Sequence, residues 1–133
     1  MLAELEQTHA EMQAALTDLD AITGEEVLDE PRLAAARVKL SRVSGKRRRI
    51  VDAATLNLLE TAGPEDARKL RGLRERNAAQ LEASTQHIGT WGLRHIVADW
   101  PGYRRASGPM RQSLHDLIAA DREILFPLLS QAP

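Results

Sequence analysis

The sequence predicts an all-α protein, an antiparallel up-down-up-down four-helix bundle that occupies residues 1–133 as a single domain. Apolar residues recur at intervals of three and four along four long segments, which is the spacing of amphipathic helices. The connections between these segments are short and marked by glycine or proline, so successive helices are expected to run antiparallel. Valine, isoleucine and threonine form no alternating runs, so strands are not expected.

The first helix is expected over residues 2–22, and its apolar repeat has one interruption. The repeat passes through His9, where the pattern calls for an apolar residue. Gly24 supplies a stop signal just beyond the last periodic residue. The apolar members of the repeat are Leu2, Leu5, Met12, Leu16 and Leu19.

The second helix is expected from about residue 32 to residue 61, after an acidic connection. Asp29 or Glu30 is expected to cap it, with Pro31 in the first turn, where a missing N–H costs nothing. Ala62-Gly63-Pro64 then breaks the chain. The inner face is marked by Leu33, Leu40, Val43, Ile50, Ala54 and Leu58.

The third helix is expected to start just after Pro64 and to continue to about residue 99. Its acidic first turn suits the positive end of the helix dipole. Gly89 and Gly92 weaken the final turns of this helix. The predicted inner residues are Leu70, Leu73, Leu81, Ile88 and Trp91, with Asn77 and Ser84 on the same stripe.

Trp100-Pro101-Gly102 is expected to form the next turn, so that the fourth helix begins at Tyr103 or restarts at Pro109. Aromatic residues and a methionine around this turn are expected to plug the end of the bundle or to contribute to a partner surface. These residues are Trp91, Trp100, Tyr103 and Met110. The apolar stripe of the last helix consists of Met110, Leu114, Leu117, Ile118, Ile124, Leu125 and Leu128.

The amino-acid composition argues against several classes of function. The net charge of −1 argues against a protein dedicated to nucleic acid or acidic membranes. The absence of cysteine excludes disulfides, thiolate metal sites and cysteine nucleophiles. No apolar run approaches the roughly 20 residues of a membrane span, and the chain opens on an amphipathic segment rather than a signal peptide. We therefore expect a cytoplasmic protein without a membrane partner.

Two polar residues interrupt apolar stripes at what counting places as one height in the bundle. Each helical residue rises about 1.5 Å, so residues at one level can be found by counting away from each turn. This counting brings His9, the inward-facing Arg47 and Asp121 together, and reaches the third helix near residue 80. Because buried charges are costly unless paired, we expect a polar core layer of His9, Arg47 and Asp121 that fixes helix register. A partial metal or ligand site at the same place is the alternative.

Both ends of the chain resemble the hemerythrin-like (HHE) domain family. The opening Leu5-Glu6-Gln7-Thr8-His9 is similar to the start of these domains. The last segment, which closes in Phe126-Pro127-Leu128-Leu129, is similar to their final helix. The resemblance implies a four-helix bundle in which His, Glu and Asp side chains hold a non-haem di-iron centre that binds oxygen or senses iron or redox state.

The chain departs from that family at most of the ligand positions. His9 matches the histidine of the first helix, and Asp121 matches the carboxylate of the last. Leu117 stands where the family has a histidine, and Arg47 and Val51 fall where a His-x-x-x-Glu pair is expected. We therefore expect no cofactor and an iron site that has been lost. His9 and Asp121 are the only ligand candidates that remain.

The sequence carries no signature of an enzyme. It has no glycine-rich phosphate loop, no pair of catalytic carboxylates and no Ser-His-Asp arrangement in a suitable context. We expect a small regulatory or protein-binding bundle with no catalytic residue and with a partner and an oligomeric state that the sequence leaves open. The alternative is a metal, oxygen or redox sensor that uses iron with a reduced ligand set around His9 and Asp121, completed by solvent oxygens or by another carboxylate such as Glu11 or Asp52.

The basic run Lys46-Arg47-Arg48-Arg49 raises a third possibility, an adaptor that meets nucleic acid or an acidic partner. Four consecutive helical residues point around most of the helix circumference, so they do not form one face. Nucleic-acid binding is therefore the weaker interpretation. A phosphorelay histidine at His115 or His87 is weaker still, since neither has the lysine and glycine neighbours of such sites.

Overall fold

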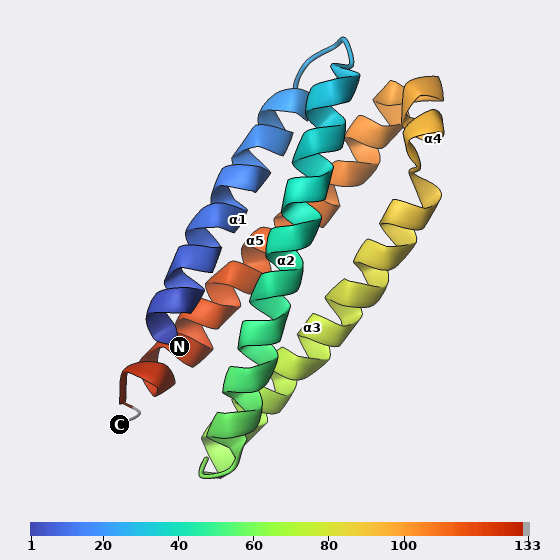
Figure 1. The fold of residues 1–133 in the computed structure, drawn as a ribbon. Coiled ribbons are helices and arrows are strands. Elements are labelled where there is room, and N and C mark those ends of the chain that lie inside the picture. Colours follow the sequence, from blue (N-terminus) through green and yellow to red (C-terminus); the bar gives the residue numbers. More distant parts are fainter. Residues whose placement is uncertain (132–133) are drawn as a thin grey trace.

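The computed structural model describes residues 1–131, and this part of the chain consists of helices and short connections, without a strand. The prediction of an all-α protein is therefore confirmed. Four long helices lie lengthwise along one another, and a short fifth helix lies where the third passes into the last (Figure 1). The helices are α1 (Leu2–Thr23), α2 (Glu30–Leu59), α3 (Pro64–Thr90), α4 (Leu93–Ala98) and α5 (Trp100–Gln131). Within residues 1–131, no helix is both long and apolar enough to cross a membrane.

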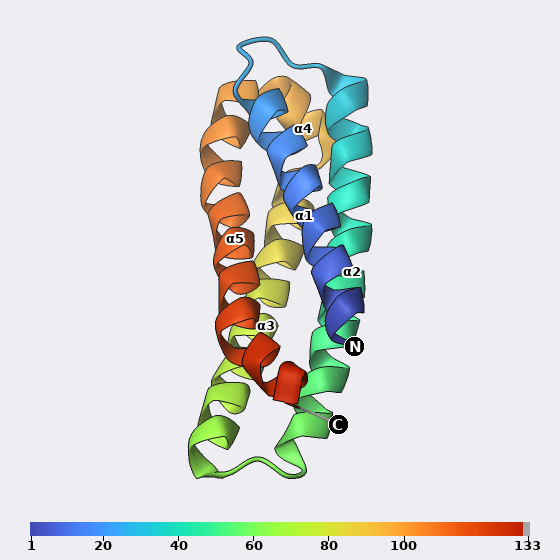
Figure 2. The ribbon, with the colours of Figure 1, turned by 90° about the vertical axis from the view of Figure 1, so that its left-hand side faces the viewer.

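The most extensive pairing is between α1 and α2, which the connection over residues 24–29 joins. Figure 2 shows α1 lying between α2 and α5, and α1 contacts both of these helices. The third helix packs against α2 and α5. The ends of α1 and α5 marked N and C lie at the same end of the molecule, opposite α4 (Figure 1).

The local signals for the first two helices operate as expected. At the end of α1 the backbone N–H of Gly24 donates to the carbonyl of Asp20, and the N–H of Glu25 donates to that of Ile22. Asp29 caps α2, and its side chain accepts the N–H of Arg32 over 3.2 Å, with Pro31 in the first turn. The second helix ends at Leu59, two residues before the predicted end.

The region between α3 and α5 differs from the prediction. A single third helix to about residue 99 is wrong, because Trp91 and Gly92 leave helical geometry and the extended Gly92 starts α4. The predicted turn at residues 100–102 is also wrong. These residues are the first turn of α5, where the carboxylate of Asp99 accepts the N–H of Gly102 over 2.9 Å. A side chain at Gly102 would collide with that carboxylate.

Pro109 lies inside α5 rather than starting a separate helix. A proline in a helix interior removes one backbone hydrogen bond and disfavours the turn before it. The helix nevertheless continues through this point, and its buried residues on both sides of Pro109 provide the packing that keeps the two parts in line. They include Tyr103 and Ser107 before the proline and Leu114 and Leu117 after it.

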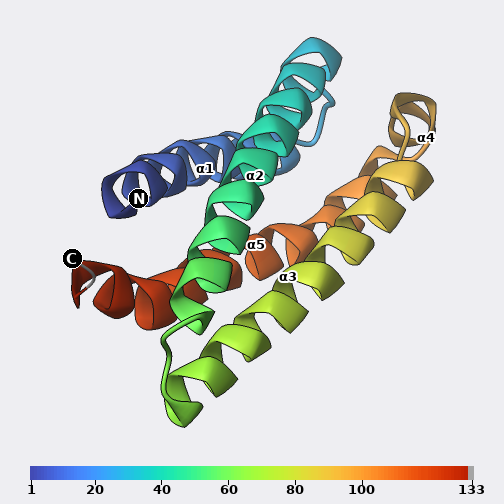
Figure 3. The ribbon, with the colours of Figure 1, turned by 60° about the horizontal axis from the view of Figure 1, so that its bottom comes forward.

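The buried core follows α1, α2 and α5 along their length but leaves α3 part of the way along. The buried residues of α3 are Ala67, Leu70, Leu73 and Asn77. Beyond Asn77 the predicted inner residues Leu81 and Ile88 are 42% and 51% exposed, so that part of the prediction is wrong. Figures 1 and 3 show that α3 diverges from α2 toward α4, which gives the physical reason for this exposure.

Candidate functional site

A cluster of four buried polar side chains lies at the level where α3 still packs against the other helices. His9 of α1, Arg47 of α2, Asn77 of α3 and Asp121 of α5 contribute one side chain from each long helix. Their exposed fractions are 0%, 3%, 5% and 0%, respectively. We call these four residues the ionic layer.

Asp121 is the acceptor at the centre of the ionic layer. Arg47 Nε donates to Asp121 Oδ2 over 2.7 Å, and Arg47 Nη2 donates to Oδ1 over 2.7 Å. His9 Nε2–H donates to the same Oδ2 over 2.8 Å. Arg47 Nη2 also donates to Asn77 Oδ1 over 3.0 Å. The structure therefore brings together His9, Arg47 and Asp121, and adds an asparagine to them.

The pairing of Arg47 with Asp121 has the geometry that best offsets the cost of burying charge. The guanidinium meets both carboxylate oxygens in a two-pronged contact, which is stronger and more directional than a single hydrogen bond. Bringing two charges out of water costs several kcal/mol per ion, and only such close, hydrogen-bonded geometry offsets it. Because the pair joins α2 to α5, a shift of either helix along its axis would break both bonds.

Two polar atoms of the ionic layer are buried without a hydrogen-bond partner among residues 1–131. They are His9 Nδ1 and Asn77 Nδ2. The His9 ring stacks on Phe126, with ring centroids 5.6 Å apart and planes inclined by 17°. This contact and the Nε2 bond fix the imidazole in one orientation, so His9 packs as an aromatic ring as well as donating a hydrogen bond.

The residues around Asp121 do not fit a di-iron centre. Both carboxylate oxygens are held by the guanidinium of Arg47, and a fixed positive charge at this place repels a metal cation. Leu117 and Val51 are buried apolar residues where the resemblance expected ligands. Within residues 1–131, no three His, Cys, Asp or Glu side chains come together in a way that could hold a metal ion.

The carboxylates considered as additional ligands do not join the ionic layer. Asp52 is exposed, and Glu11 accepts a 3.4 Å hydrogen bond from Gln7 on the exposed side of α1. Level counting reached α3 near Asn77, but the predicted polar layer did not include this residue. The available signal was its place on the inner stripe of α3, four residues from Leu73 and about one turn from the counted level.

The basic run on α2 does not form one charged face. Arg47 is turned into the core, Lys46 and Arg48 are half-buried, and Arg49 is exposed. One of the four charges is therefore neutralised internally, and the other three point in different directions around the helix. This arrangement gives no continuous strip of cations along a single helix face.

The aromatic residues near α4 pack around one another, as expected for this end of the molecule. Tyr103 is the centre of the group, with its ring 5.7 Å from that of Trp91 and 5.9 Å from that of Trp100. Trp100 Nε1 donates to the carbonyl of Glu25 over 3.1 Å, which ties the start of α5 to the connection between α1 and α2. His87 adds a fourth ring, 5.8 Å from Tyr103.

Comparison of the chain with protein-family models, with curated proteins and with solved structures found no match.

Proposed function

We propose that this chain is a hemerythrin-like, up-down-up-down four-helix bundle in which the ionic layer replaces the di-iron centre. In this proposal α4 is an insertion in the connection between the third and fourth helices of the bundle. The protein catalyses no reaction and acts in the cytoplasm as a regulatory module through contact with another protein. The resemblance of both chain ends to the family supports the bundle, and the ionic layer supports the loss of iron.

The single observation that carries this proposal is the two-pronged pairing of Arg47 with Asp121. Arg47 provides a permanent positive charge at the centre of the helices, where a metal ion would otherwise be needed to compensate the carboxylate. Asp121 keeps its hydrogen bond to His9 in this arrangement. The charge balance of the layer is therefore complete without a metal.

Contact with a protein partner is supported by apolar side chains that remain exposed around α4. Ile88 at the end of α3 is 51% exposed, and Leu93 and Val97 of α4 are 37% and 53% exposed. Exposed apolar side chains that lie near one another on a small protein are typical of an interaction site. These residues lie on one short stretch of chain, so a partner could cover them together.

Metal analysis tests the central part of the proposal. The protein would be purified without a histidine tag and without chelator, analysed for metals, and then exposed to ferrous iron under anaerobic conditions. We expect far less than one iron per chain before and after this exposure, and no oxo-bridge absorption band after admission of air. About two irons per chain with such a band would contradict the proposal.

The same measurement decides the alternative of a metal or oxygen sensor with a reduced ligand set. A sensor built on His9 and Asp121 has to release Asp121 from Arg47 when iron binds. Stoichiometric uptake of ferrous iron that disappears in an Asp121→Asn variant would therefore favour the sensor. An uptake that is unchanged in this variant would place the metal elsewhere on the chain.

A further inference from the structure

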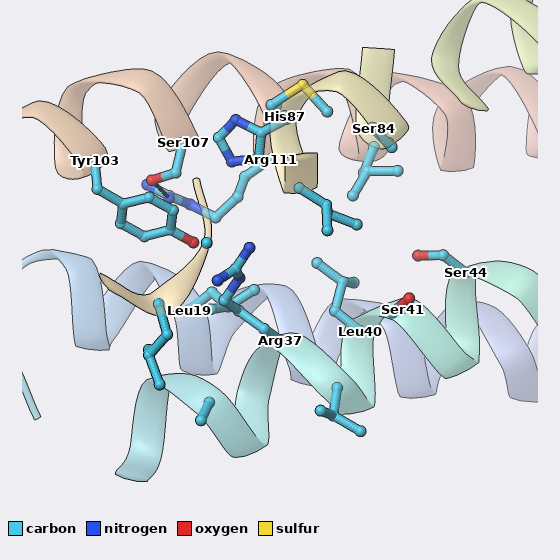
Figure 4. A pocket seen from close by; sticks show the side chains of 17 residues that line it. Leu19, Arg37, Leu40, Ser41, Ser44, Ser84, His87, Tyr103, Ser107 and Arg111 are labelled. Atoms are coloured by element: carbon cyan, nitrogen blue, oxygen red, sulfur yellow. Dashed lines mark hydrogen bonds between the residues drawn. The ribbon is translucent and has the colours of Figure 1, made fainter. Parts of the chain in front are cut away.

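A pocket opens beside α4, where α3 has diverged from α2. It lies between α2, α3 and α5 and has a volume of about 450 Å³ (Figure 4). Pockets that hold small molecules are mostly apolar and occupy roughly 300–1,000 Å³. The walls of this pocket are mostly apolar, and they include Leu40, Ile88, Leu93, Met110 and Leu114.

The arginines of the pocket gather at one end, together with a tyrosine and a histidine. Arg37 reaches in from α2, while Tyr103 and Arg111 come from α5 on the opposite side, with His87 of α3 beside them (Figure 4). The guanidinium carbon of Arg37 lies 5.7 Å from the centre of the Tyr103 ring. The pocket therefore has a cationic end and a mostly apolar body, with Ser41, Ser44 and Ser84 on the side away from Tyr103.

The cationic end carries uncompensated positive charge. Arg111 is neutralised by Asp20, with Nε donating to Oδ1 over 2.6 Å, but Arg37 makes no ion pair with any residue of the described 1–131. No aspartate or glutamate is among the described side chains that line the pocket. Burial, together with the charges of Arg37 and Arg111, lowers the pKa of His87 from its ordinary value and so favours the neutral imidazole.

The position of Arg37 distinguishes it from the solvated arginines of the same helix. It is half-buried, and its charged end lies against the face of Tyr103, which is 3% exposed. A cation held at the mouth of an apolar pocket is only partly solvated. Its attraction for an anion is therefore stronger than that of a fully solvated surface arginine. Arg42, one and a half turns further along α2, is exposed and does not line the pocket.

We propose that this pocket binds an amphipathic monocarboxylate, a free organic acid whose carboxylate meets Arg37 and whose hydrocarbon body lies against Leu40, Ile88 and Leu114. The carboxylate accepts N–H donors of the guanidinium, and Tyr103 packs beside the first carbons of the chain. No residue of the ionic layer lines the pocket, so binding of a carboxylate there does not depend on the metal content of the protein.

Decanoate is a suitable probe, because it combines one carboxylate with a flexible apolar chain. Calorimetric titration of the whole protein, at concentrations below micelle formation, is expected to show one saturable site per chain. Amide chemical-shift changes are expected at Ser84, Leu93 and Tyr103. Decanol has the same chain without the charge and is expected to bind about tenfold more weakly or worse.

Matched variants locate the site. Arg37→Met keeps the length of the side chain and removes its charge, and is expected to weaken decanoate binding about tenfold. Arg42→Met is the control on the same helix and is expected to leave the affinity unchanged. Ser84→Phe places a ring in the pocket and is expected to abolish binding; circular dichroism would confirm that each variant keeps its helices.

Four results would overturn the inference. They are the absence of saturable decanoate binding by the folded wild-type protein, equal affinities for decanoate and decanol, equal losses in the Arg37→Met and Arg42→Met variants, and a dimer that occupies the pocket and is not dissociated by decanoate. The last would be detected by analytical ultracentrifugation, and it would assign the pocket to a second copy of the chain.

Discussion

Two arginines on α2, Arg47 and Arg37, lie ten positions apart and differ in burial and in the pairing of their charges. Arg47 is 3% exposed and pairs with both oxygens of Asp121, whereas Arg37 is half-buried and has no carboxylate partner among residues 1–131. The difference arises because the distance between α3 and α2 changes along the molecule. At the level of Arg47, α3 is close enough for Asn77 to join the ionic layer, while at the level of Arg37 it has moved away and a pocket lies between the helices.

This comparison distinguishes an arginine whose charge is paired inside the protein from one whose charge is available to a ligand. A buried charge that is paired with both oxygens of a buried carboxylate stabilises one arrangement of the helices. A half-buried cation beside an apolar pocket that has no carboxylate partner among residues 1–131 can pair with an anion from outside. The two regions are thus expected to respond differently to the same kinds of substitution.

The largest expected effect is at the ionic layer. Asp121→Ala leaves Arg47 as an unpaired buried charge and is expected to lower the free energy of unfolding by about 3–5 kcal/mol. Asp20→Ala also removes the partner of an arginine, but Asp20 is half exposed to solvent, so a loss of about 1 kcal/mol or less is expected. Urea denaturation of both variants measures the contrast. Equal losses would contradict the distinction between the two pairs.

A second contrast uses two apolar residues of α3. Leu73 is 1% exposed where α3 packs against the other helices, and Ile88 is 51% exposed beside the pocket. Leu73→Ala is expected to cost about 3 kcal/mol through lost burial and cavity formation. Ile88→Ala is expected to cost less than about 1 kcal/mol, since its side chain is already largely in water. If Ile88→Ala proves as costly as Leu73→Ala, α3 does not diverge from α2 in solution.

These contrasts also show what the sequence could and could not predict. Apolar periodicity identifies the inward face of each helix, and counting from short turns placed His9, Arg47 and Asp121 within one turn of one another. That procedure works where neighbouring helices stay in contact. It does not work for Leu81 and Ile88, because a helix face can be apolar whether or not another helix is close enough to cover it.

The pocket lay outside sequence reasoning for the same reason. Arg37, His87 and Arg111 are separated by long stretches of chain and belong to no motif, and each is an ordinary residue on an amphipathic helix. Their convergence depends on the break at Trp91 and Gly92, which allows α4 to form and α5 to begin at Trp100. Glycines at 89 and 92 indicated a weakened helix but not its new direction.

The smallest expected effect is the pH dependence contributed by His87. Burial and the charges of Arg37 and Arg111 lower its pKa in the folded protein below the 6.5 of an unfolded histidine. The unfolded chain therefore binds this proton more readily, so His87 is expected to reduce stability as the pH falls below about 6.5. The stability difference between wild type and His87→Gln, measured from about pH 7.5 to pH 5, isolates this contribution. A difference that is constant over this range would contradict the environment described for His87.

A double-mutant cycle at Arg47 and Asp121 tests most directly whether these two side chains stabilise the ionic layer as partners. The single variants Arg47→Met and Asp121→Leu each leave a buried charge unpaired, and each is expected to lose about 3 kcal/mol or more. The double variant removes both charges and is expected to recover most of this loss, with a coupling energy of at least about 2 kcal/mol. Losses that simply add in the double variant would show that the two side chains are not partners and would contradict the account.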